Sequence, residues 1–219
     1  MKEVAILVEG QTEEKFVKEV LQPITPIEEI YFKPIIITSK RSRAGEKNRG
    51  GLTSYDKAKR DLLNILEAKN YHIVSTMVDY YQLPENFPGY SELGKYGTAL
   101  ERVEFLEKKF GEDIADRRFI PYLQFHEFES LLYSNPNASL EILSNNKIKN
   151  MMTRALSDFS NDPELVNNSV ETAPSKRILK VYPKYEKVFH GIKIAKAVGL
   201  DVMRERCKHF DQWVEKLIA

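Results

Sequence analysis

The chain opens with a short, uninterrupted apolar segment that ends abruptly at an acidic residue and a glycine. Residues 4–8 (VAILV) are continuously apolar and partly β-branched, which is typical of a strand covered on both faces in a parallel sheet. Glu9 and Gly10 follow directly, and apolar positions within residues 13–21 then recur at helical spacing, with Thr12 placed to cap that helix. A strand that leads at once into a helix indicates an α/β fold. It also places Glu9 at the carboxyl edge of a sheet, where ligands bind in open α/β proteins.

The same alternation continues through the first part of the chain. Further strands are predicted at residues 30–37, 72–78 and 119–125, and helices at residues 55–69 and around residues 100–110. Strands that alternate with helices favour parallel pairing with right-handed crossovers. We therefore expect a Rossmann-like, mostly parallel four-stranded sheet with flanking helices over residues 1–133.

The C-terminal third has a different pattern, because no convincing strand follows His126. Helical segments are predicted near residues 128–133, 140–156, 192–197 and 208–217, with residues 172–177 interrupting the helices. Phe210 and Trp213 lie three apart on the last segment and are expected to be core or interface anchors. We expect residues 134–219 to form a helical extension packed on the α/β core.

Composition excludes several classes of protein. The 219 residues carry a formal net charge of +1, so nucleic acid could be bound only through local basic patches. The single cysteine, Cys207, excludes an intrachain disulfide framework and a multi-cysteine zinc site, and is most simply a core thiol. No apolar run has the length of a signal peptide core or a membrane span. A soluble, cytoplasmic protein with no membrane partner is the expectation.

Acidic side chains follow three of the predicted strands. Glu9 comes after the first, Asp79 after the third, and Glu127 and Glu129 just after the fourth. If the strands are parallel, these groups meet at one edge of the sheet. Carboxylates held close together repel one another unless a proton or a cation neutralises them, and hard oxygen ligands suit Mg²⁺ or Mn²⁺. We therefore predict a divalent cation site, with Glu9 as a metal ligand or general base.

Each of these residues could also have a purely structural role. Glu9 and Glu13 could be charges that favour a helix N-terminus. His126 is a candidate ligand or proton carrier, but it could also be a structural histidine with its hydrogen bonds satisfied. Glu127 and Glu129 are two residues apart and cannot share a helical face, so one of them is expected to face solvent. Zinc is disfavoured because the histidines show no ligand spacing, and no glycine-rich phosphate cradle is present.

Basic residues gather in two places where they could contact phosphates. A glycine-punctuated polar loop carries Lys40, Arg41, Arg43, Lys47 and Arg49, and a second group, Lys176 and Arg177, follows Pro174. Phosphate contacts from basic groups beside a metal site are a common division of labour in nucleases. The alternative is that these charges are simply solvated.

Residues 8–13 (VEGQTE), placed after a first strand, resemble the opening motif of TOPRIM domains of topoisomerases, bacterial primases and overcoming-lysogenization-defect (OLD) nucleases. Asp79 stands where the acidic DxD motif of TOPRIM domains begins, but Tyr81 replaces its second aspartate. Over nearly its whole length, including residues 77–81, 125–129 and 173–177, the chain is similar to the prokaryotic RloG-like proteins. The resemblance implies a TOPRIM-like fold and Mg²⁺-dependent nucleic-acid chemistry that uses Glu9 and Asp79. It also implies a place in a defence locus beside a separate ATPase.

Three functional hypotheses follow. The leading one is a metal-dependent endonuclease, with DNA favoured as substrate, that uses Glu9, Asp79 and one of Glu127 or Glu129. The second is a non-catalytic binding or sensor partner of an ATPase, since the missing second aspartate would weaken metal binding. The third, a Rossmann-like enzyme acting on a small phosphorylated molecule, lacks the glycine loop that it needs. A homodimer is compatible with each of them.

Overall fold

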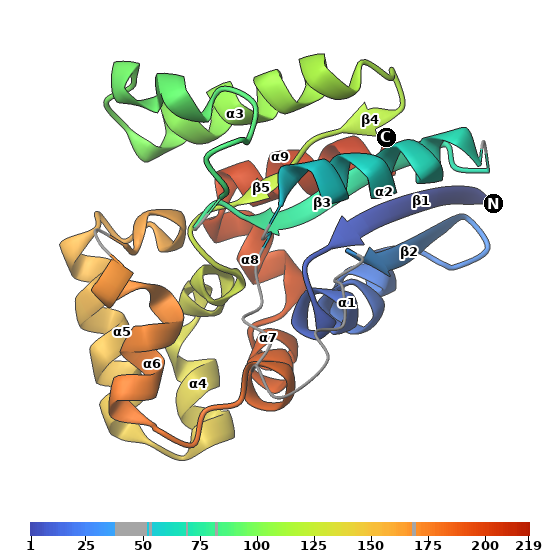
Figure 1. The fold of residues 1–219 in the computed structure, drawn as a ribbon. Coiled ribbons are helices and arrows are strands. Elements are labelled where there is room, and N and C mark those ends of the chain that lie inside the picture. The colour runs from blue at the N-terminus through green and yellow to red at the C-terminus, as the bar shows by residue number, and fades with distance from the viewer. Residues whose placement is uncertain (38–51, 53, 69, 82, 168–169) are drawn as a thin grey trace, which may run out of the picture.

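The computed structural model describes residues 1–37, 52, 54–68, 70–81, 83–167 and 170–219. A parallel sheet lies at its centre (Figure 1). The strands are β1 (Lys2–Val8), β2 (Ile30–Ile36), β3 (Ile73–Asp79), β4 (Phe119–Ile120) and β5 (Leu123–Gln124). Their order is β2-β1-β3-β4, and β5 also pairs with β3. The predicted mostly parallel α/β sheet with flanking helices is confirmed.

The last predicted strand is divided into two short ones. Pro121 lies between β4 and β5, and proline has no N–H to donate to a ladder. Side chains of β3 bridge the gap: Ser75 Oγ donates to the Ile120 carbonyl at 2.6 Å, and Thr76 Oγ1 donates to the Tyr122 carbonyl at 2.9 Å. The Tyr122 N–H donates back to Thr76 Oγ1 at 3.0 Å. The strand direction therefore continues past the break, and residues 125–129 still emerge at the carboxyl edge of the sheet.

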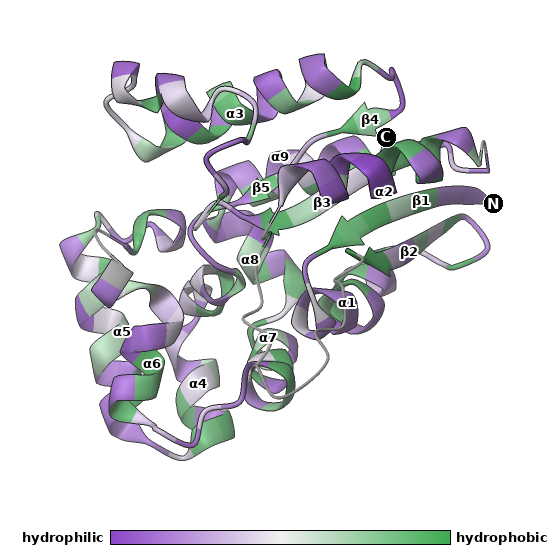
Figure 2. Cartoon of the chain, viewed as in Figure 1, coloured by the Kyte–Doolittle hydropathy of each residue, from purple (hydrophilic) through white to green (hydrophobic). Residues whose placement is uncertain are grey.

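Two layers of helices cover the sheet, each with its own hydrophobic cluster. On one face, α2 (Tyr55–Glu67) and α3 (Ala99–Ile114) pack on alternate residues of β1 and β3, namely Ala5, Leu7, Val74 and Val78. On the other face, α1 (Gln11–Phe16), its π-helical continuation η1 (Val17–Leu21) and the C-terminal helices pack on Val4, Ile6, Val8 and Met77. The strands are accordingly mostly apolar, whereas the helices mix polar and apolar residues (Figure 2).

The C-terminal part consists of helices and helical turns. They are η4 (Phe128–Ser134), α4 (Pro136–Leu143), α5 (Asn146–Asp158), η5 (Pro163–Leu165), η6 (Val170–Thr172), α6 (Pro174–Val181), η7 (Lys187–Gly191), α7 (Ile192–Val198), α8 (Leu200–Arg206) and α9 (Lys208–Ile218). Two shorter turns, η2 (Gln22–Ile24) and η3 (Tyr90–Lys95), precede β2 and α3. Within the described residues, no helix has both the length and the apolar character required to cross a bilayer.

Three local predictions of where helices begin and end were wrong. Thr12 does not cap the first helix, because α1 begins at Gln11 with Gly10 at the N-cap, and Thr12 is buried inside the helix. Residues 174–177 do not interrupt a helix but begin α6, with Pro174 in the first turn, where its missing N–H costs nothing. The predicted helix over residues 140–156 is two helices, since Ser144 adopts a left-handed conformation with φ of 50°.

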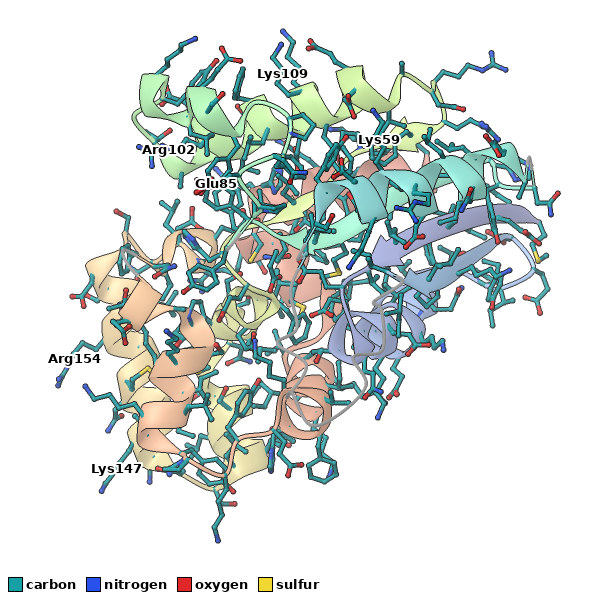
Figure 3. The ribbon with its side chains drawn as sticks, in the orientation of Figure 1. Lys59, Glu85, Arg102, Lys109, Lys147 and Arg154 are labelled. Atoms are coloured by element: carbon teal, nitrogen blue, oxygen red, sulfur yellow. The ribbon has the colours of Figure 1, made fainter. Side chains whose placement is uncertain are left out.

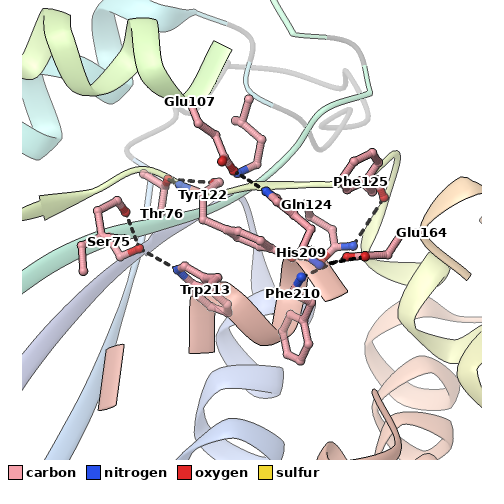
Figure 4. Close-up of polar contacts among 12 residues, drawn as sticks. Ser75, Thr76, Glu107, Tyr122, Gln124, Phe125, Glu164, His209, Phe210 and Trp213 are labelled. Atoms are coloured by element: carbon pink, nitrogen blue, oxygen red, sulfur yellow. Dashed lines mark hydrogen bonds and ion pairs between the residues drawn. The ribbon is translucent and has the colours of Figure 1, made fainter. Parts of the chain in front are cut away.

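The final helix, α9, is fastened to the sheet by buried polar contacts (Figure 4). Trp213 Nε1 donates to Ser75 Oγ at 2.8 Å, and the Trp213 ring stacks on Tyr122 with centroids 4.3 Å apart. Glu164 accepts from the first backbone amides of α9, those of His209 and Phe210, both at 3.0 Å. Phe210, Trp213 and Cys207 are buried, which confirms their prediction as core residues.

Replacing Trp213 with alanine should lower the free energy of unfolding by about 3–5 kcal/mol, because it removes a buried aromatic ring and leaves Ser75 without its donor. Urea denaturation followed by far-UV circular dichroism measures this change. Lys216→Ala, an exposed position on the same helix, is the control and should change the value by less than about 0.5 kcal/mol. Equal stability of the two variants would contradict the role assigned to Trp213.

Candidate functional site at the carboxyl edge of the sheet

The structure brings Glu9 and Asp79 together at the ends of two neighbouring strands. Because β1 and β3 are parallel and Val8 lies opposite Met77, both strands end at the same edge. The Asp79 N–H donates to Glu9 Oε1 at 2.8 Å, and Asp79 Oδ1 in turn accepts from the Phe128 N–H at 3.1 Å. The two carboxylates thus accept hydrogen bonds from backbone amides of the adjoining strand and turn.

Glu127 and Glu129 also point inward, contrary to the expectation that one of them faces solvent. Their exposed fractions are 6% and 0%. The reason is tertiary, since every residue of η4 is buried between the sheet and the C-terminal helices. Glu127 Oε2 accepts from the Ser175 N–H at 3.0 Å in the first turn of α6. Glu129 accepts from Tyr185 Oη at 3.4 Å and contacts Lys187 Nζ at 3.1 Å.

Lys187 is the functional candidate that the sequence analysis missed. It begins the π-helical turn η7 and lies 58 residues beyond Glu129 in the chain. Burial opposes its charged form, yet the carboxylates of Glu129, Glu127 and Asp79 together raise its pKa. The ammonium therefore stays charged inside the acidic cluster. Nothing in the sequence around Lys187 distinguishes it from neighbouring lysines, so only the fold identifies it.

Burial raises the pKa of four carboxyl groups in the cluster, those of Glu9, Glu13, Asp79 and Glu129. Desolvation is the largest cause for each of the four, and repulsion from neighbouring carboxylates adds to it for Glu9, Asp79 and Glu129. Burial, together with the charge of Glu13, raises the pKa of Glu9 to about 8. Burial likewise raises the pKa of Glu129 to about 7. The pKa of Asp79 is raised well above its ordinary value by burial and then by Glu9 and Glu13. The ionised forms of these groups are therefore destabilised unless positive charge lies nearby.

Glu13 belongs to the cluster, although it lies one helical turn into α1. Glu13 Oε2 lies 3.6 Å from the position that a Cβ atom on Gly10 would occupy. Burial raises the pKa of Glu13, and its charge raises the pKa values of Glu9 and Asp79. Glu13, which was predicted as a possible supporting residue, therefore interacts with Glu9 through its charge.

His126 lies beside the cluster in a strained and neutral state. Its backbone has φ of 58°, and its ring lies near Tyr80 and Phe125, with centroids 6.4 and 6.0 Å away. Burial lowers the pKa of His126 to about 4, so the ring is uncharged at neutral pH. Within the described residues, His126 Nε2 and Tyr81 Oη are buried without a hydrogen-bond partner. Such groups cost about 1–3 kcal/mol each and are found where a ligand or functional constraint maintains them.

The donor chemistry of the cluster fits Mg²⁺ or Mn²⁺, which prefer carboxylate oxygens. One oxygen of Asp79 and one oxygen of Glu127 each accept from a backbone amide, and Glu9 accepts from the backbone amides of Asp79 and Leu52. In the arrangement of the described residues, no three acidic, histidine or cysteine side chains are close enough to hold a metal. A bound ion would therefore have to draw these carboxylates closer together.

The predicted basic residues have separate outcomes. Lys40, Arg41, Arg43, Lys47 and Arg49 lie outside the residues that the structure describes. Lys176 is 3.8 Å from Glu171, and Arg177 Nε donates to the Thr172 carbonyl at 2.7 Å.

Arg177 also lines a cavity of about 290 Å³ between α5 and α6. Two further cations, Lys147 and Arg154, line it with Asp158. Both extend away from α5 (Figure 3). The cavity thus combines three cations with one carboxylate. Arg177, which lines the cavity, and Ser175, whose N–H donates to Glu127, both lie on α6. The same helix therefore contacts both the basic cavity and the acidic cluster.

The fold and the cluster together define an α/β protein whose parallel sheet carries desolvated carboxylates at its carboxyl edge. The chain belongs to the DUF4276 family, described as a domain of unknown function, whose model matches residues 8–218. Among solved structures it is similar to the C-terminal region of the Burkholderia pseudomallei OLD protein, with 12% sequence identity, 100% of each chain covered and a TM-score of 0.47. No curated protein matches the chain.

Replacing Glu9 with glutamine should make the protein less sensitive to alkaline pH. Since the pKa of Glu9 rises from 4.5 to about 8 on folding, its neutral form stabilises the fold below pH 4.5, and this contribution is lost as the pH rises through about 8. Urea unfolding in EDTA at pH 5 and 8.5 should show that the wild type loses on the order of 1–3 kcal/mol more than Glu9→Gln. Glu14→Gln, on the following helix α1 and paired with Lys18, is the control. Parallel stability curves for wild type and Glu9→Gln would exclude this account.

Proposed function

We propose that this protein is a metal-dependent nuclease of TOPRIM-like fold, which hydrolyses nucleic-acid phosphodiesters at the acidic cluster. The observation that supports this most is the meeting of Glu9, Asp79 and Glu127, from three separate segments, at the carboxyl edge of one sheet. Ligands bind at this edge in open α/β proteins. The similarity of residues 8–13 and Asp79 to TOPRIM motifs points to the same chemistry.

In this proposal Glu9, Asp79 and Glu127 would hold Mg²⁺ or Mn²⁺ through their carboxylate oxygens. When bound, the cation would supply Lewis acidity to a phosphoryl oxygen. Glu129 is held by Lys187 and Tyr185 and remains outside this ligand set. Glu13, beside Glu9, is the remaining carboxylate and is suited to accept a proton, because burial raises its pKa.

DNA is the proposed substrate, with its phosphates contacting the basic surface formed by Lys147, Arg154 and Arg177. Within the described residues these three side chains form no ion pair. Their cavity carries net positive charge, although the whole chain is nearly neutral at +1. A local patch of this kind is the form of nucleic-acid binding that the composition permits. The similarity to RloG-like proteins extends the proposal to a defence system with a separate ATPase.

One observation favours a second candidate function, a non-catalytic TOPRIM-like partner or sensor. Tyr81 stands where the second aspartate of the DxD motif would lie, and its hydroxyl is buried without a partner among the described residues. With Lys187 already neutralising part of the cluster, such a site could serve structure alone. Binding of Mg²⁺ that is lost in Asp79→Asn would exclude this candidate, because a purely structural cluster has no need of the ion.

The purified protein should nick supercoiled plasmid DNA in Mn²⁺, and Glu9→Gln should reduce the rate by about a hundredfold or more, since a ligand or base is removed. Agarose gels with time points measure the rate. Glu14→Gln leaves the carboxylates of the cluster in place and should nick at the wild-type rate. Unchanged activity in Glu9→Gln would refute the assignment, whereas no nicking by any of the three proteins would favour the partner or sensor.

Neutralising Lys147 and Arg154 together with glutamine should weaken DNA binding more at low salt than at high salt. Each cation that no longer neutralises a phosphate should make the slope of log affinity against log salt concentration shallower by about 0.9, which gives about 1.8 for the double variant. Fluorescence anisotropy with a labelled duplex in EDTA measures this without cleavage. Lys109→Gln is the control, since Lys109 pairs with Glu112 on α3, away from α5 (Figure 3). An unchanged slope in the double variant would place the DNA elsewhere.

A further inference from the structure

The segment from α6 to α7 is rich in basic and aromatic residues. Residues 176–196 contain seven lysine or arginine residues and one carboxylate, Glu186, in a chain whose net charge is +1. Four rings are interleaved with these charges, those of Tyr182, Tyr185, Phe189 and His190. We propose that this segment binds an unpaired strand of nucleic acid, with one base stacked on Phe189. This inference rests on the proposed function and specifies the form of nucleic acid that the protein receives.

Phe189 is the one aromatic side chain among the described residues that is more than half exposed, at 52%. A single exposed apolar side chain is common on protein surfaces, so its surroundings decide what it means. Lys193 Nζ lies over the Phe189 ring, 4.0 Å from its centroid. An exposed ring with a cation beside it is typical of sites that bind single strands, because the ring stacks on a base while the cation contacts a phosphate.

A series of rings connects Phe189 with the acidic cluster. The Phe189 ring packs edge-to-face on His190, with centroids 5.0 Å apart. The His190 ring stacks on Tyr185 with centroids 6.1 Å apart, and Tyr185 Oη donates to Glu129 at 3.4 Å. This series passes from a buried carboxylate to solvent, since Tyr185 is 6% exposed and Phe189 52%. A strand with a base stacked on Phe189 would therefore lie beside the cluster.

Several cations of this segment are available for phosphates. Three of the seven are paired with carboxylates, namely Lys176, Lys187 and Lys196. In the part of the chain that the structure describes, three others are exposed and form no ion pair: Lys180, Lys184 and Lys193. Unpaired charge of one sign attracts an anionic partner such as a phosphate backbone. Lysine is depleted in protein–protein interfaces, so this composition favours nucleic acid over a protein partner.

The exposed ring favours an unpaired strand over a duplex. In a duplex the faces of the bases are covered by neighbouring bases, and the edges in the grooves are read by hydrogen bonds. A base of a single strand can turn its face outward and stack on an aromatic side chain. Phe189 has no hydrogen-bonding group in its side chain, so it contributes stacking and apolar contact alone. Its chemistry therefore matches the face of a base rather than an edge.

Fluorescence anisotropy in EDTA, with a labelled oligothymidine and a duplex of equal length, measures the two affinities without cleavage. Phe189→Ala should weaken single-strand binding by about fivefold to a hundredfold, since one stacked base is lost, and change duplex binding by less than about twofold. Phe189→Tyr keeps a ring and should retain the wild-type affinity. Leu179→Ala is the matched control, because Leu179 is 39% exposed on α6 within the same basic segment and has no ring. It should bind both probes as the wild type does.

A second measurement in the wild type locates the strand on the surface. Irradiation of a bound oligonucleotide that contains iodouracil, followed by peptide mass spectrometry, identifies side chains that stack on its bases. The crosslink should fall on Phe189. Crosslinks on other surfaces with none on Phe189 would overturn the proposal. Thermal melts of each variant establish that it is folded before it is titrated.

The outcomes distinguish this inference from the proposed function. If folded Phe189→Ala loses no more affinity for the single strand than for the duplex, the stacking proposal is overturned, while nicking that depends on Glu9 can still hold. Full retention of both affinities would assign the exposed ring to a protein partner instead. If the folded wild type binds neither probe, both the inference and the nuclease proposal fail. Selective loss of single-strand binding together with a crosslink on Phe189 supports the inference.

Discussion

The structure depends on neutralising negative charges that the fold gathers in one desolvated place. Parallel strands bring their carboxyl ends together, so acidic residues at or just beyond the ends of β1, β3 and β5 converge although like charges repel. Backbone amides of Asp79, Phe128 and Ser175 each donate to one carboxylate. Within the described residues, Lys187 is the cation whose charge acts on most of the cluster. The geometry of the candidate site follows from this electrostatic constraint.

The C-terminal helices are part of the solution to that constraint. They bury η4 and thereby turn both Glu127 and Glu129 inward, and they contribute the Ser175 amide and the Lys187 ammonium. Their attachment to the sheet is strong because Trp213 stacks on Tyr122 and donates to Ser75 at the place where Pro121 interrupts the last strand. The packing that stabilises the fold and the contacts that shape the cluster therefore come from the same segment of the chain.

Much of the α/β core could be predicted because its signals are local. An apolar run such as residues 4–8 has one stable environment, a sheet covered on both faces, and the alternation with amphipathic segments specifies parallel pairing. The ends of elements were less predictable, since competing local signals decide them: Gly10 takes the N-cap position expected for Thr12, and a left-handed Ser144 divides a continuous helical pattern. The start of α6 at Pro174 was mistaken for an interruption because proline both ends and begins helices.

By itself, the sequence determined which residues follow the strands, and therefore that Glu9 and Asp79 would meet, because parallel pairing leaves their side chains no other edge. Only the tertiary structure decided the environment of those carboxylates. The inward orientation of Glu129, the neutral state of His126 and the presence of Lys187 all depend on contacts between segments tens of residues apart. Desolvation and charge pairing are properties of the packed whole, so no local pattern in the chain encodes them.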